Sequence, residues 1–430
     1  MQLFDKYLND FEKVIQRKVE PDSLIHNGSY FEKSAKLNES QFSEASYPVP
    51  IDGPKTLFLY DKKVIESLFG KNPYEFEKIN IGAHPDFSDL GQNQTINHHC
   101  TNVFIDIKGS TKLINKYSLP QIRLIKDSLL TLAINVANQF GGHVHRLQGD
   151  GIFLQFVKKN KTPNHSVINA LNMTSLLTHF VATELSDLMR NNEISPIKIR
   201  TGIDFGYKED VLWSHYGLPD CSELTTTSLH TDLAAKLQAM AGNNSILIGD
   251  NVIRILDLRE EYIKQFVDKT GKVIKHYEVN STLVYPFFEF DWKKYLTLLP
   301  FFSDNSQNLE FVQKQSEFSL ICYTAENDKK NKQYYPNSFA LEKGEKLLFE
   351  LQERGQRFTL KAGDQVSWTA SNSGKEAADA NESKHNFEGQ YENKAECKTS
   401  AGYLGHHILY CDIKRINNPL VHLKFPIFVL

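Results

Sequence analysis

Short apolar runs alternate with helical patterns between about residues 100 and 290, which restricts the chain to folds in which helices cover a sheet. The run TNVFIDI suits a buried strand. Residues 118–139 then place apolar side chains on one helical face, with Pro120 in the first turn and a Gly-Gly pair at the end. The runs HVHRLQ and IFLQFV meet at a Gly-Asp-Gly tip, which is a hairpin signal.

The same alternation continues through residues 165–190, which predict a second helix. IKIRTGIDFG follows as a strand, LHTDLAAKLQAMAG as a short helix and SILIG as another strand. The order strand, helix, strand, strand, helix, strand is the split βαβ plan, in which we expect helices on one face of the sheet.

The two ends of the chain differ from this central stretch. Residues 1–20 predict an amphipathic helix, either packed on its own chain or in a dimer contact, and residues 21–55 predict a connector. After about residue 295, runs such as SEFSLICYTA, KLLFELQ, GHHILYCDI and VHLKFPIFVL predict an all-β part, a sandwich. The polar stretch SGKEAADANESKHN predicts an exposed loop.

Composition narrows the functional classes. The formal net charge of −3 argues against a nucleic-acid binder that relies on a basic surface. Five cysteines without CxxC spacing indicate neither a disulfide framework nor a structural zinc site, so we expect a reducing compartment. The N-terminus lacks a signal-peptide pattern and no apolar run reaches about 18 residues, so we expect a cytoplasmic protein without membrane insertion.

Two aspartates end strands that the split βαβ plan makes neighbours. Asp106 closes the first strand in FIDIKGST, and Asp150 lies at the hairpin tip in RLQGDGIFLQF. Either one alone is typical of a turn or a helix cap. Together, at one sheet edge, they predict a site for hard divalent cations. A phosphate-binding turn is expected directly after the first strand, at Lys108, Gly109, Ser110 and Thr111.

These motifs resemble the class III nucleotidyl cyclases. FIDIKGSTKL and HRLQGDGIFLQF are similar to that family's two metal motifs, IRTGIDFG to its central strand and LHTDLAAKLQ to its catalytic helix, in the family's order over roughly residues 100–290. The resemblance implies that Asp106, Ile107 and Asp150 hold two Mg²⁺ or Mn²⁺ ions for cyclisation of a nucleoside triphosphate. It also implies a head-to-tail homodimer with two sites at the interface.

The chain departs from the family where the base is read. Arg146 stands at the position of the base-reading Lys or Glu, and Thr225 at that of the base-reading Asp. The catalytic helix carries Asp232 for the family's Asn and Lys236 for its Arg, so Lys236 is expected to stabilise phosphate charge and Asp232 to contact base or ribose. Arginine offers only donors, which suits the two carbonyls of uracil. Two alternatives are an Arg146 paired with a nearby carboxylate and a solvated Lys236.

The C-terminal segments QVSWTASNSGKEA, KTSAGYLGHHILYCDI and LKFPIFVL resemble the sensor domain attached to such cyclases, and the whole resembles the pyrimidine cyclases of the Pycsar antiphage system. The resemblance implies an α+β fold: a class III core with a split βαβ, ferredoxin-like sheet, followed by an all-β sensor domain. We expect an N-terminal helix and connector over 1–55, the cyclase domain over 56–295 and the sensor domain over 296–430.

The implied activity is conversion of UTP to cyclic UMP, and CTP to cyclic CMP is the alternative. A purine cyclase, or a degenerate homologue that only binds nucleotide, remains a further alternative. The resemblance also implies a separately encoded effector that responds to the product, and a phage trigger.

Other polar residues are harder to assign. His143 and His145 share a strand face and are expected to be packed and hydrogen-bonded rather than metal-bound, as are His98 and His99. The family's phosphate-binding lysine after the core falls on one of two residues in VDKTGKVIKHY, Lys269 or Lys272.

Overall fold

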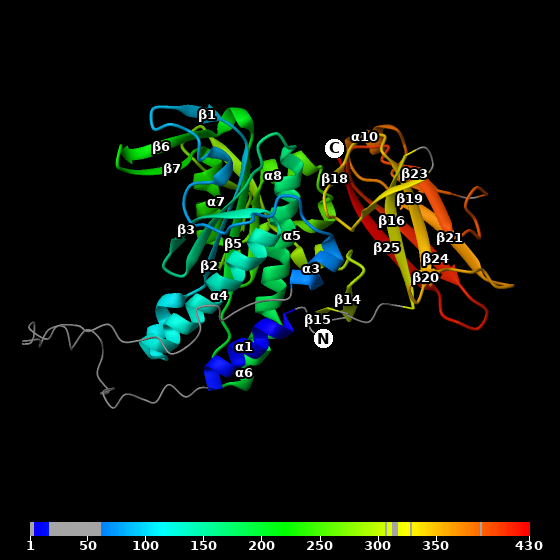
Figure 1. Cartoon of the computed structure of the whole chain (residues 1–430), viewed down its shortest axis with the longest axis horizontal. Coiled ribbons are helices and arrows are strands. Elements are labelled where there is room, and N and C mark those ends of the chain that lie inside the picture. The colour runs from blue at the N-terminus through cyan, green and yellow to red at the C-terminus, as the bar shows by residue number, and fades with distance from the viewer. Residues whose placement is uncertain (1–3, 17–61, 306–307, 312–316, 327–328, 388) are drawn as a thin grey trace, which may run out of the picture.

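The computed structural model of the chain describes residues 4–16, 62–305, 308–311, 317–326, 329–387 and 389–430. A part that mixes helices with a sheet, here called the α/β part, lies beside a smaller part made of two β-sheets, the β-sandwich part (Figure 1). The predicted α+β fold with an all-β C-terminal part is confirmed. The connector predicted over 21–55 lies outside the described residues.

The α/β part is built on one eight-stranded sheet, in the order β12-β13-β8-β5-β2-β4-β3 with β9 beside β13. Its strands are β2 (Cys100–Ile107), β3 (Gly142–Gln148), β4 (Gly151–Phe156), β5 (Ile199–Gly206), β8 (Ser245–Gly249), β9 (Ile263–Lys264), β12 (His276–Glu278) and β13 (Val284–Phe290). Neighbours run antiparallel except β5 and β8, which are parallel. The tip between β3 and β4 therefore lies beside the end of β2, as the split βαβ plan requires.

One face of this sheet is covered by helices that share its main hydrophobic core. These helices are α3 (Lys62–Phe69), α4 (Leu119–Gln139), α5 (Pro163–Ala182), α6 (Glu184–Asn191), α8 (Asp250–Leu256) and α9 (Trp292–Leu296). The prediction of a single helix over 165–190 is wrong in one respect, because this stretch forms two helices, α5 and α6. Thr183, with φ −114° and ψ −92°, interrupts the helical backbone between them.

Helix α7 (Leu229–Met240) packs on the other face of β5 and β2, so the expectation of helices on one face only was wrong. Gly202 of β5 explains the close approach. A Cβ at that position would lie 2.2 Å from the Ala234 carbonyl oxygen and 2.3 Å from the Gln238 nitrogen. Only glycine leaves room for the helix backbone there.

The N-terminal helix α1 (Asp5–Gln16) packs on its own chain, which confirms the first of its two interpretations. Phe4, Tyr7 and Phe11 are buried, and Phe4 and Tyr7 contact the ring of Phe180 in α5. The Tyr7 hydroxyl donates a 2.9 Å hydrogen bond to the Ser128 carbonyl in α4.

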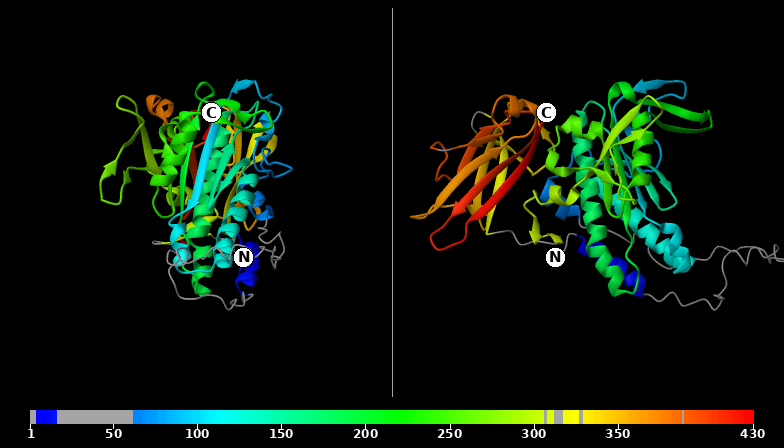
Figure 2. Two further views of the ribbon diagram at one scale, coloured as in Figure 1. Left: turned by 90° about the vertical axis from the view of Figure 1, so that its left-hand side faces the viewer. Right: turned by 180° about the vertical axis from the view of Figure 1, so that it is seen from behind.

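Two small β elements project from the α/β part. The first is a sheet in the order β1-β6-β7, made of β1 (Thr95–Asn97), β6 (Leu212–Leu218) and β7 (Cys221–Thr227). The second is the hairpin of β10 (Phe266–Val267) and β11 (Val273–Ile274), which extends away from the body in the left view of Figure 2.

The β-sandwich part stacks two five-stranded sheets around a second core that includes Phe349, Trp368 and Phe425. One sheet is made of β16 (Phe318–Glu326), β17 (Lys329–Tyr334), β19 (Lys346–Glu353), β20 (Gln356–Arg357) and β23 (Glu396–Ser400). The other is made of β18 (Ala340–Leu341), β21 (Gln365–Ser371), β22 (Lys384–Asn386), β24 (Gly405–Lys414) and β25 (Val421–Val429). The stretch predicted as a loop, SGKEAADANESKHN, instead contains helix α10 (Lys375–Asp379) and β22.

The two parts share buried contacts. Ala340, Ile408 and Phe428 of the sandwich belong to the main core of the α/β part. The Asn172 side chain donates to the Asn337 carbonyl (2.8 Å), and its amide oxygen accepts from Tyr295 (2.7 Å). The domain boundary between 295 and 296 stays a prediction.

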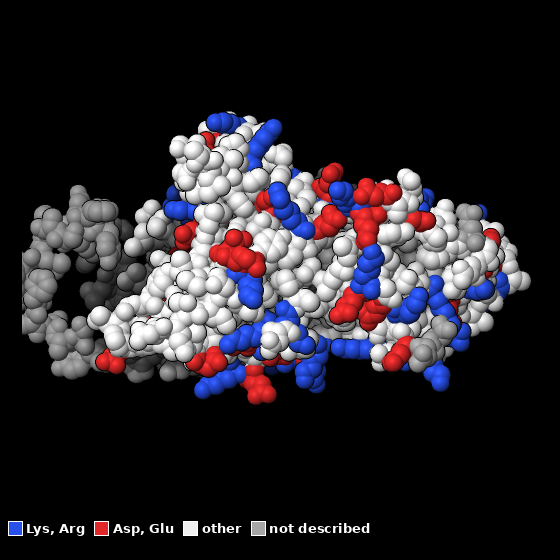
Figure 3. Space-filling view, turned by 90° about the horizontal axis from the view of Figure 1, so that it is seen from above, with Lys and Arg blue, Asp and Glu red and all other residues white. Residues whose placement is uncertain are grey.

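Surface charge agrees with the small net charge. Acidic and basic side chains are interspersed on the face in Figure 3. In the described ranges, none of the helices has both the length and the apolar character needed to cross a membrane.

Candidate active site

Asp106 and Asp150 meet at one edge of the sheet, as the sequence predicted. Asp106 is the next-to-last residue of β2, and Asp150 lies in the turn that precedes β4, which pairs with β2. Both carboxylates are largely buried and interact. Burial raises the pKa of Asp106, and the adjacent Asp150 raises it further against the opposing charge of Arg200. Burial also disfavours ionised Asp150, but Asp106, Ser110 and Lys126 outweigh that effect and lower its pKa.

Cationic and amide groups hold the two carboxylates. Arg200, opposite Asp106 in the β2–β5 pairing, donates to Asp106 Oδ2 from Nη2 (2.6 Å) and Nε (3.1 Å). Gln238 of α7 reaches the same oxygen at 3.3 Å, and Lys126 Nζ lies 3.3 Å from Asp150 Oδ1. None of these three residues was predicted from the sequence. The β2–β5 register that sets Arg200 beside Asp106 was not visible in the motifs.

The carboxylate pair fits a divalent cation. Asp150 Oδ2 is buried and accepts no hydrogen bond from a described residue, so it is an oxygen ligand without a partner. Among the described residues, no group of three or more His, Cys, Asp or Glu side chains has metal-site geometry. Two carboxylates with a backbone carbonyl are nevertheless a usual protein contribution to Mg²⁺, which takes further ligands from water and substrate phosphates.

The predicted phosphate turn is only partly available. Gly109, with φ +75°, starts the short 3-10 helix η3 (Ser110–Asn115), and Thr111 is exposed. Lys108 is engaged elsewhere: its ammonium donates to the Ala241 carbonyl (2.7 Å) and its backbone N–H to the Lys198 carbonyl.

The charge of Lys269, in the β10–β11 hairpin, acts on Lys108 of this turn. Burial lowers the pKa of Lys108, and the charges of Arg200 and Lys269 lower it further. Lys272 instead belongs to the hairpin turn, where its N–H donates to Asp268. Of the two candidate lysines, Lys269 is the one whose charge acts on Lys108, and the choice between them stays a prediction.

Arg146 is paired with a carboxylate, the alternative that the sequence left open. Its Nε donates to Glu223 Oε1 of β7 (3.0 Å), and its Nη2 contacts Oε2. His145 Nε2 lies 3.3 Å from the same Glu223 carboxylate. Thr225 is two residues further along β7, on the strand face of Glu223. The predicted base readers Arg146 and Thr225 thus share a surface with Glu223, a residue that was not predicted from the sequence.

His143 and His145 are placed as the sequence predicted. His143 Nε2 and His145 Nδ1 both lie within hydrogen-bond distance of the Gly82 carbonyl, at 2.9 and 3.2 Å, which confirms packed, hydrogen-bonded histidines.

Asp232 and Lys236 lie one turn apart on the exposed face of α7. Neither side chain is in an ion pair or hydrogen bond with the residues that the structure describes. Gln238, on a different side of the helix, is the α7 residue that contacts Asp106. A single chain therefore does not bring Asp232 and Lys236 to its own carboxylate pair.

A buried network fixes the start of α7. His230 Nδ1 lies 2.9 Å from Asp204 Oδ2 of β5, and the Tyr285 hydroxyl donates to Asp204 Oδ1 (3.0 Å). Burial alone lowers the pKa of His230, but the Asp204 carboxylate outweighs it and raises the pKa above its ordinary value. The network holds the helix that presents Asp232 and Lys236.

Comparison with known proteins identifies the family. Residues 292–429 match the Adenylyl/Guanylyl and SMODS C-terminal sensor domain. Over 418 residues the chain is 34% identical to a cytidylate cyclase of Staphylococcus aureus. The alignment covers 94% of this chain and 97% of that protein. The chain belongs to the Pycsar-like family of class III nucleotidyl cyclases. A cytidylate cyclase of Escherichia coli is 32% identical over 328 residues, 69% of this cyclase and 70% of that protein.

Among solved structures, the adenylyl cyclase CyaB from P. aeruginosa is similar to half of this cyclase. The alignment has a TM-score of 0.39 and 19% identity, and it covers 50% of this chain and 100% of that one.

Proposed function

We propose that this cyclase converts CTP to 3′,5′-cyclic CMP and pyrophosphate. The observation that carries the choice of base is the Arg146–Glu223 pair, because it offers both a donor and an acceptor at the position where the family reads the base. Cytosine presents an exocyclic amine that needs an acceptor, and ring N3 and O2 that need donors. The cytidylate cyclase names of the relatives support the same substrate.

The expectation of UTP gains no support from these relatives. It rested on Arg146 as a pure donor, and Glu223 now adds a carboxylate beside the guanidinium. A carboxylate next to the O4 carbonyl of uracil is unfavourable, because both groups only accept hydrogen bonds. UTP remains the second candidate if Glu223 moves away when nucleotide binds.

Asp106, Asp150 and the Ile107 carbonyl are the groups that would hold two divalent cations, Mn²⁺ or Mg²⁺. The cations would supply positive charge beside the triphosphate. Arg200 would keep Asp106 ionised and oriented through its hydrogen bonds to Oδ2. Ser110 and Gly109 would contact phosphate oxygens through the turn, and Lys269 would add a cation on that side.

Cyclisation joins the ribose 3′-oxygen, which gives up its proton to solvent, to the α-phosphorus as the bond to pyrophosphate breaks. Lys236 would stabilise the negative charge that gathers on the α-phosphate, and Asp232 would accept from ribose or base. Arg146, Glu223 and Thr225 would hold cytosine. Because Lys236 faces away from the carboxylates of its own chain, these roles require a second subunit, and we propose a head-to-tail homodimer with two sites.

The small β1-β6-β7 sheet supports dimerisation. It stands out from the body (Figure 1), and Leu218 (72%), Tyr216 (49%) and Ile96 (36%) are exposed on it. An exposed apolar group of this kind is typical of a contact surface.

We further propose that cyclic CMP activates a separately encoded effector in antiphage defence, with a phage component as trigger.

Incubation of the full chain with Mn²⁺ and each nucleoside triphosphate tests the proposal. We expect cyclic CMP and pyrophosphate from CTP. Cyclic UMP alone would contradict the choice of base but leave the cyclase. Turnover of ATP or GTP alone would contradict a pyrimidine cyclase, and tight nucleotide binding without pyrophosphate release would indicate a degenerate homologue.

A further inference from the structure

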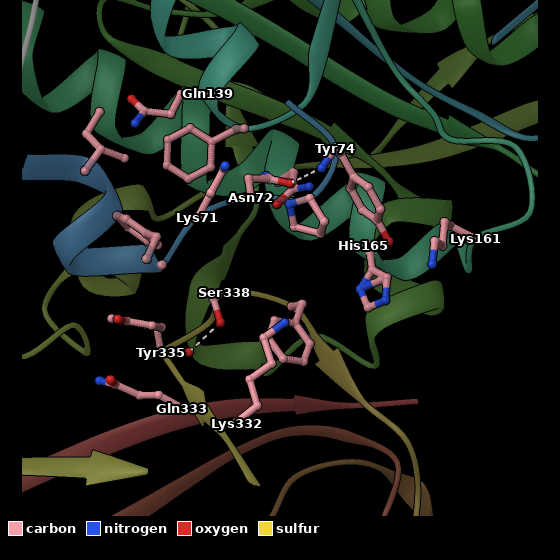
Figure 4. A pocket seen from close by; sticks show the side chains of 17 residues that line it. Lys71, Asn72, Tyr74, Gln139, Lys161, His165, Lys332, Gln333, Tyr335 and Ser338 are labelled. Atoms are coloured by element: carbon pink, nitrogen blue, oxygen red, sulfur yellow. Dashed lines mark hydrogen bonds between the residues drawn. The ribbon is translucent and has the colours of Figure 1, made fainter. Parts of the chain in front are cut away.

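A cavity of about 230 Å³ lies where the α/β part meets the β-sandwich part (Figure 4). One wall is formed by residues 69–74, the end of α4 and the start of α5. The other wall is formed by residues 332–339, between β17 and β18. We call this space the joint cavity; it is separate from the carboxylate pair.

The joint cavity is positively charged. Lys71, Lys161 and Lys332 line it, and none of the described residues in its walls is acidic. No described carboxylate pairs with any of these three lysines. The charge of Lys161 also acts on His165 in the cavity wall. Burial of the imidazole, and after it the charge of Lys161, lowers the pKa of His165 to about 4. An anion would therefore enter a site whose cations are unneutralised.

Aromatic side chains form much of the remaining wall. Tyr74, Tyr335 and Phe339 line the cavity, and the Lys332 ammonium lies 5.5 Å from the Phe339 ring centroid. Tyr335 is seated directly on Gly70, where a Cβ would lie 2.7 Å from the ring. Such rings offer flat faces to a planar group.

Polar groups for directional recognition are also present. The neutral His165 accepts the Ala340 N–H at Nδ1 (3.3 Å), which leaves its proton on Nε2 as a donor. Asn169 also lines the cavity, and its side-chain amide can donate and accept hydrogen bonds there.

From these features we propose that the joint cavity binds a nucleoside monophosphate. The phosphate would meet Lys332, with Lys71 and Lys161 adding positive charge from opposite sides of the cavity (Figure 4), and the base would stack on Tyr74 or Tyr335. The volume lies below the usual range of roughly 300–1,000 Å³ for drug-sized ligands, which favours one phosphate over three. The choice of CMP as the probe rests on the proposed cytidylate activity.

The position of the cavity gives the ligand a means to affect the enzyme. Gln139 and Phe140, the end of α4, form part of its wall, and β3 begins at Gly142 and carries Arg146. The opposite wall belongs to the segment between β17 and β18. An occupant therefore contacts both the catalytic part and the sensor domain, and it binds best in one arrangement of the two.

Calorimetry with the full-length Asp106→Ala variant tests the proposal, because this variant has lost the predicted catalytic metal ligand. CMP, cyclic CMP and inorganic phosphate are titrated separately. Within the same background, Lys332→Gln and Tyr335→Ala probe the cavity. Lys346→Gln is the matched control, since Lys346 is an exposed sandwich lysine without an ion pair to a described residue.

We expect one CMP per chain, bound at least about tenfold more weakly by Lys332→Gln and by Tyr335→Ala, with the Lys346→Gln control unchanged. Cyclic CMP, with one phosphate charge, is expected to bind more weakly than CMP, and inorganic phosphate more weakly still. Absence of CMP binding, or CMP binding that neither cavity variant weakens, would overturn the site. Phosphate that binds as tightly as CMP would overturn base recognition.

Discussion

Arg200 and Asp106 face each other across strands β5 and β2, with Arg200 Nη2 2.6 Å from Asp106 Oδ2. Both side chains are about three-quarters buried, so the pair neutralises a carboxylate that would otherwise repel Asp150. We expect Arg200→Gln to destabilise the metal-free protein by about 2 kcal/mol. Mn²⁺ should restore more stability in this variant than in the wild type, because the cation replaces the lost charge.

Thermal unfolding with and without Mn²⁺ measures this effect. Arg190→Gln, which removes an exposed arginine paired with Asp187, is the control and should change little. An equal Mn²⁺ response in Arg200→Gln and wild type would contradict the role assigned to Arg200.

Asp106→Asn and Asp150→Asn are each expected to abolish pyrophosphate release from CTP, since each removes a charged oxygen ligand from the predicted metal site. Asp127→Asn changes an exposed aspartate on α4 and should retain wild-type turnover. Continued turnover in either active-site variant would remove the metal assignment. Unchanged circular dichroism would exclude misfolding as the cause of a loss.

Glu223→Ala tests the choice of base. Loss of the carboxylate removes the acceptor for the cytosine amine and frees Arg146, so kcat/KM for CTP should fall by roughly tenfold to a hundredfold while UTP gains relative to CTP. Competition between the two nucleotides in one reaction gives the ratio directly. Glu209→Ala, at an exposed acid in the short helix η4 (Lys208–Asp210), should leave the ratio as it is. A CTP preference that survives Glu223→Ala would refute base reading by this pair.

The buried carboxyl of Glu184 is expected to make the free energy of unfolding depend on pH. Burial, followed by the charge of Asp5, raises the pKa of the Glu184 carboxyl to about 7 at the contact of α6 with α1. A carboxyl with a raised pKa contributes its stability below its unfolded value near 4.5 and loses it as pH rises through about 7. The loss is on the order of 3 kcal/mol.

Unfolding of Glu184→Gln between pH 5 and 8 measures this contribution. The variant should lack the decline and be more stable than the wild type at pH 8. Asp187→Asn, an exposed change on the same helix, should keep the wild-type pH profile. A parallel decline in Glu184→Gln would assign the effect to another group.

Leu218→Glu tests the proposed homodimer. The residue is 72% exposed in β6, and a charge there should weaken an apolar contact between subunits. Light scattering after gel filtration should then find a monomer. We also expect this monomer to bind CTP poorly. Leu420→Glu, at another exposed leucine in the sandwich, should remain dimeric. Equal dimerisation of both variants would exclude the β1-β6-β7 sheet from the interface.

Local patterns predicted the elements that carry the site. Periodicity and end signals located α4, the β3–β4 hairpin and α7, and adjacency in the split βαβ plan brought Asp106 to Asp150. Each of these inferences uses residues close in sequence or a rule of topology.

Contacts set by register or by distant segments could not be predicted. Arg200 reaches Asp106 through the β2–β5 register, and Glu223 reaches Arg146 from a hairpin with no apolar alternation strong enough to predict it. The break at Thr183 lies within a continuous apolar pattern. The joint cavity depends on segments more than 150 residues apart, which no local pattern relates.

Ala340, Ile408 and Phe428 insert sandwich side chains into the core of the α/β part, and this has a consequence for how such proteins diversify. A fragment ending near residue 295 would leave the matching apolar surface in water, where it favours aggregation. A sandwich borrowed from a relative will fit only if it carries complementary side chains at these three positions. Sensor and catalyst must therefore change together across evolution, and recombination between relatives should succeed only as paired exchanges.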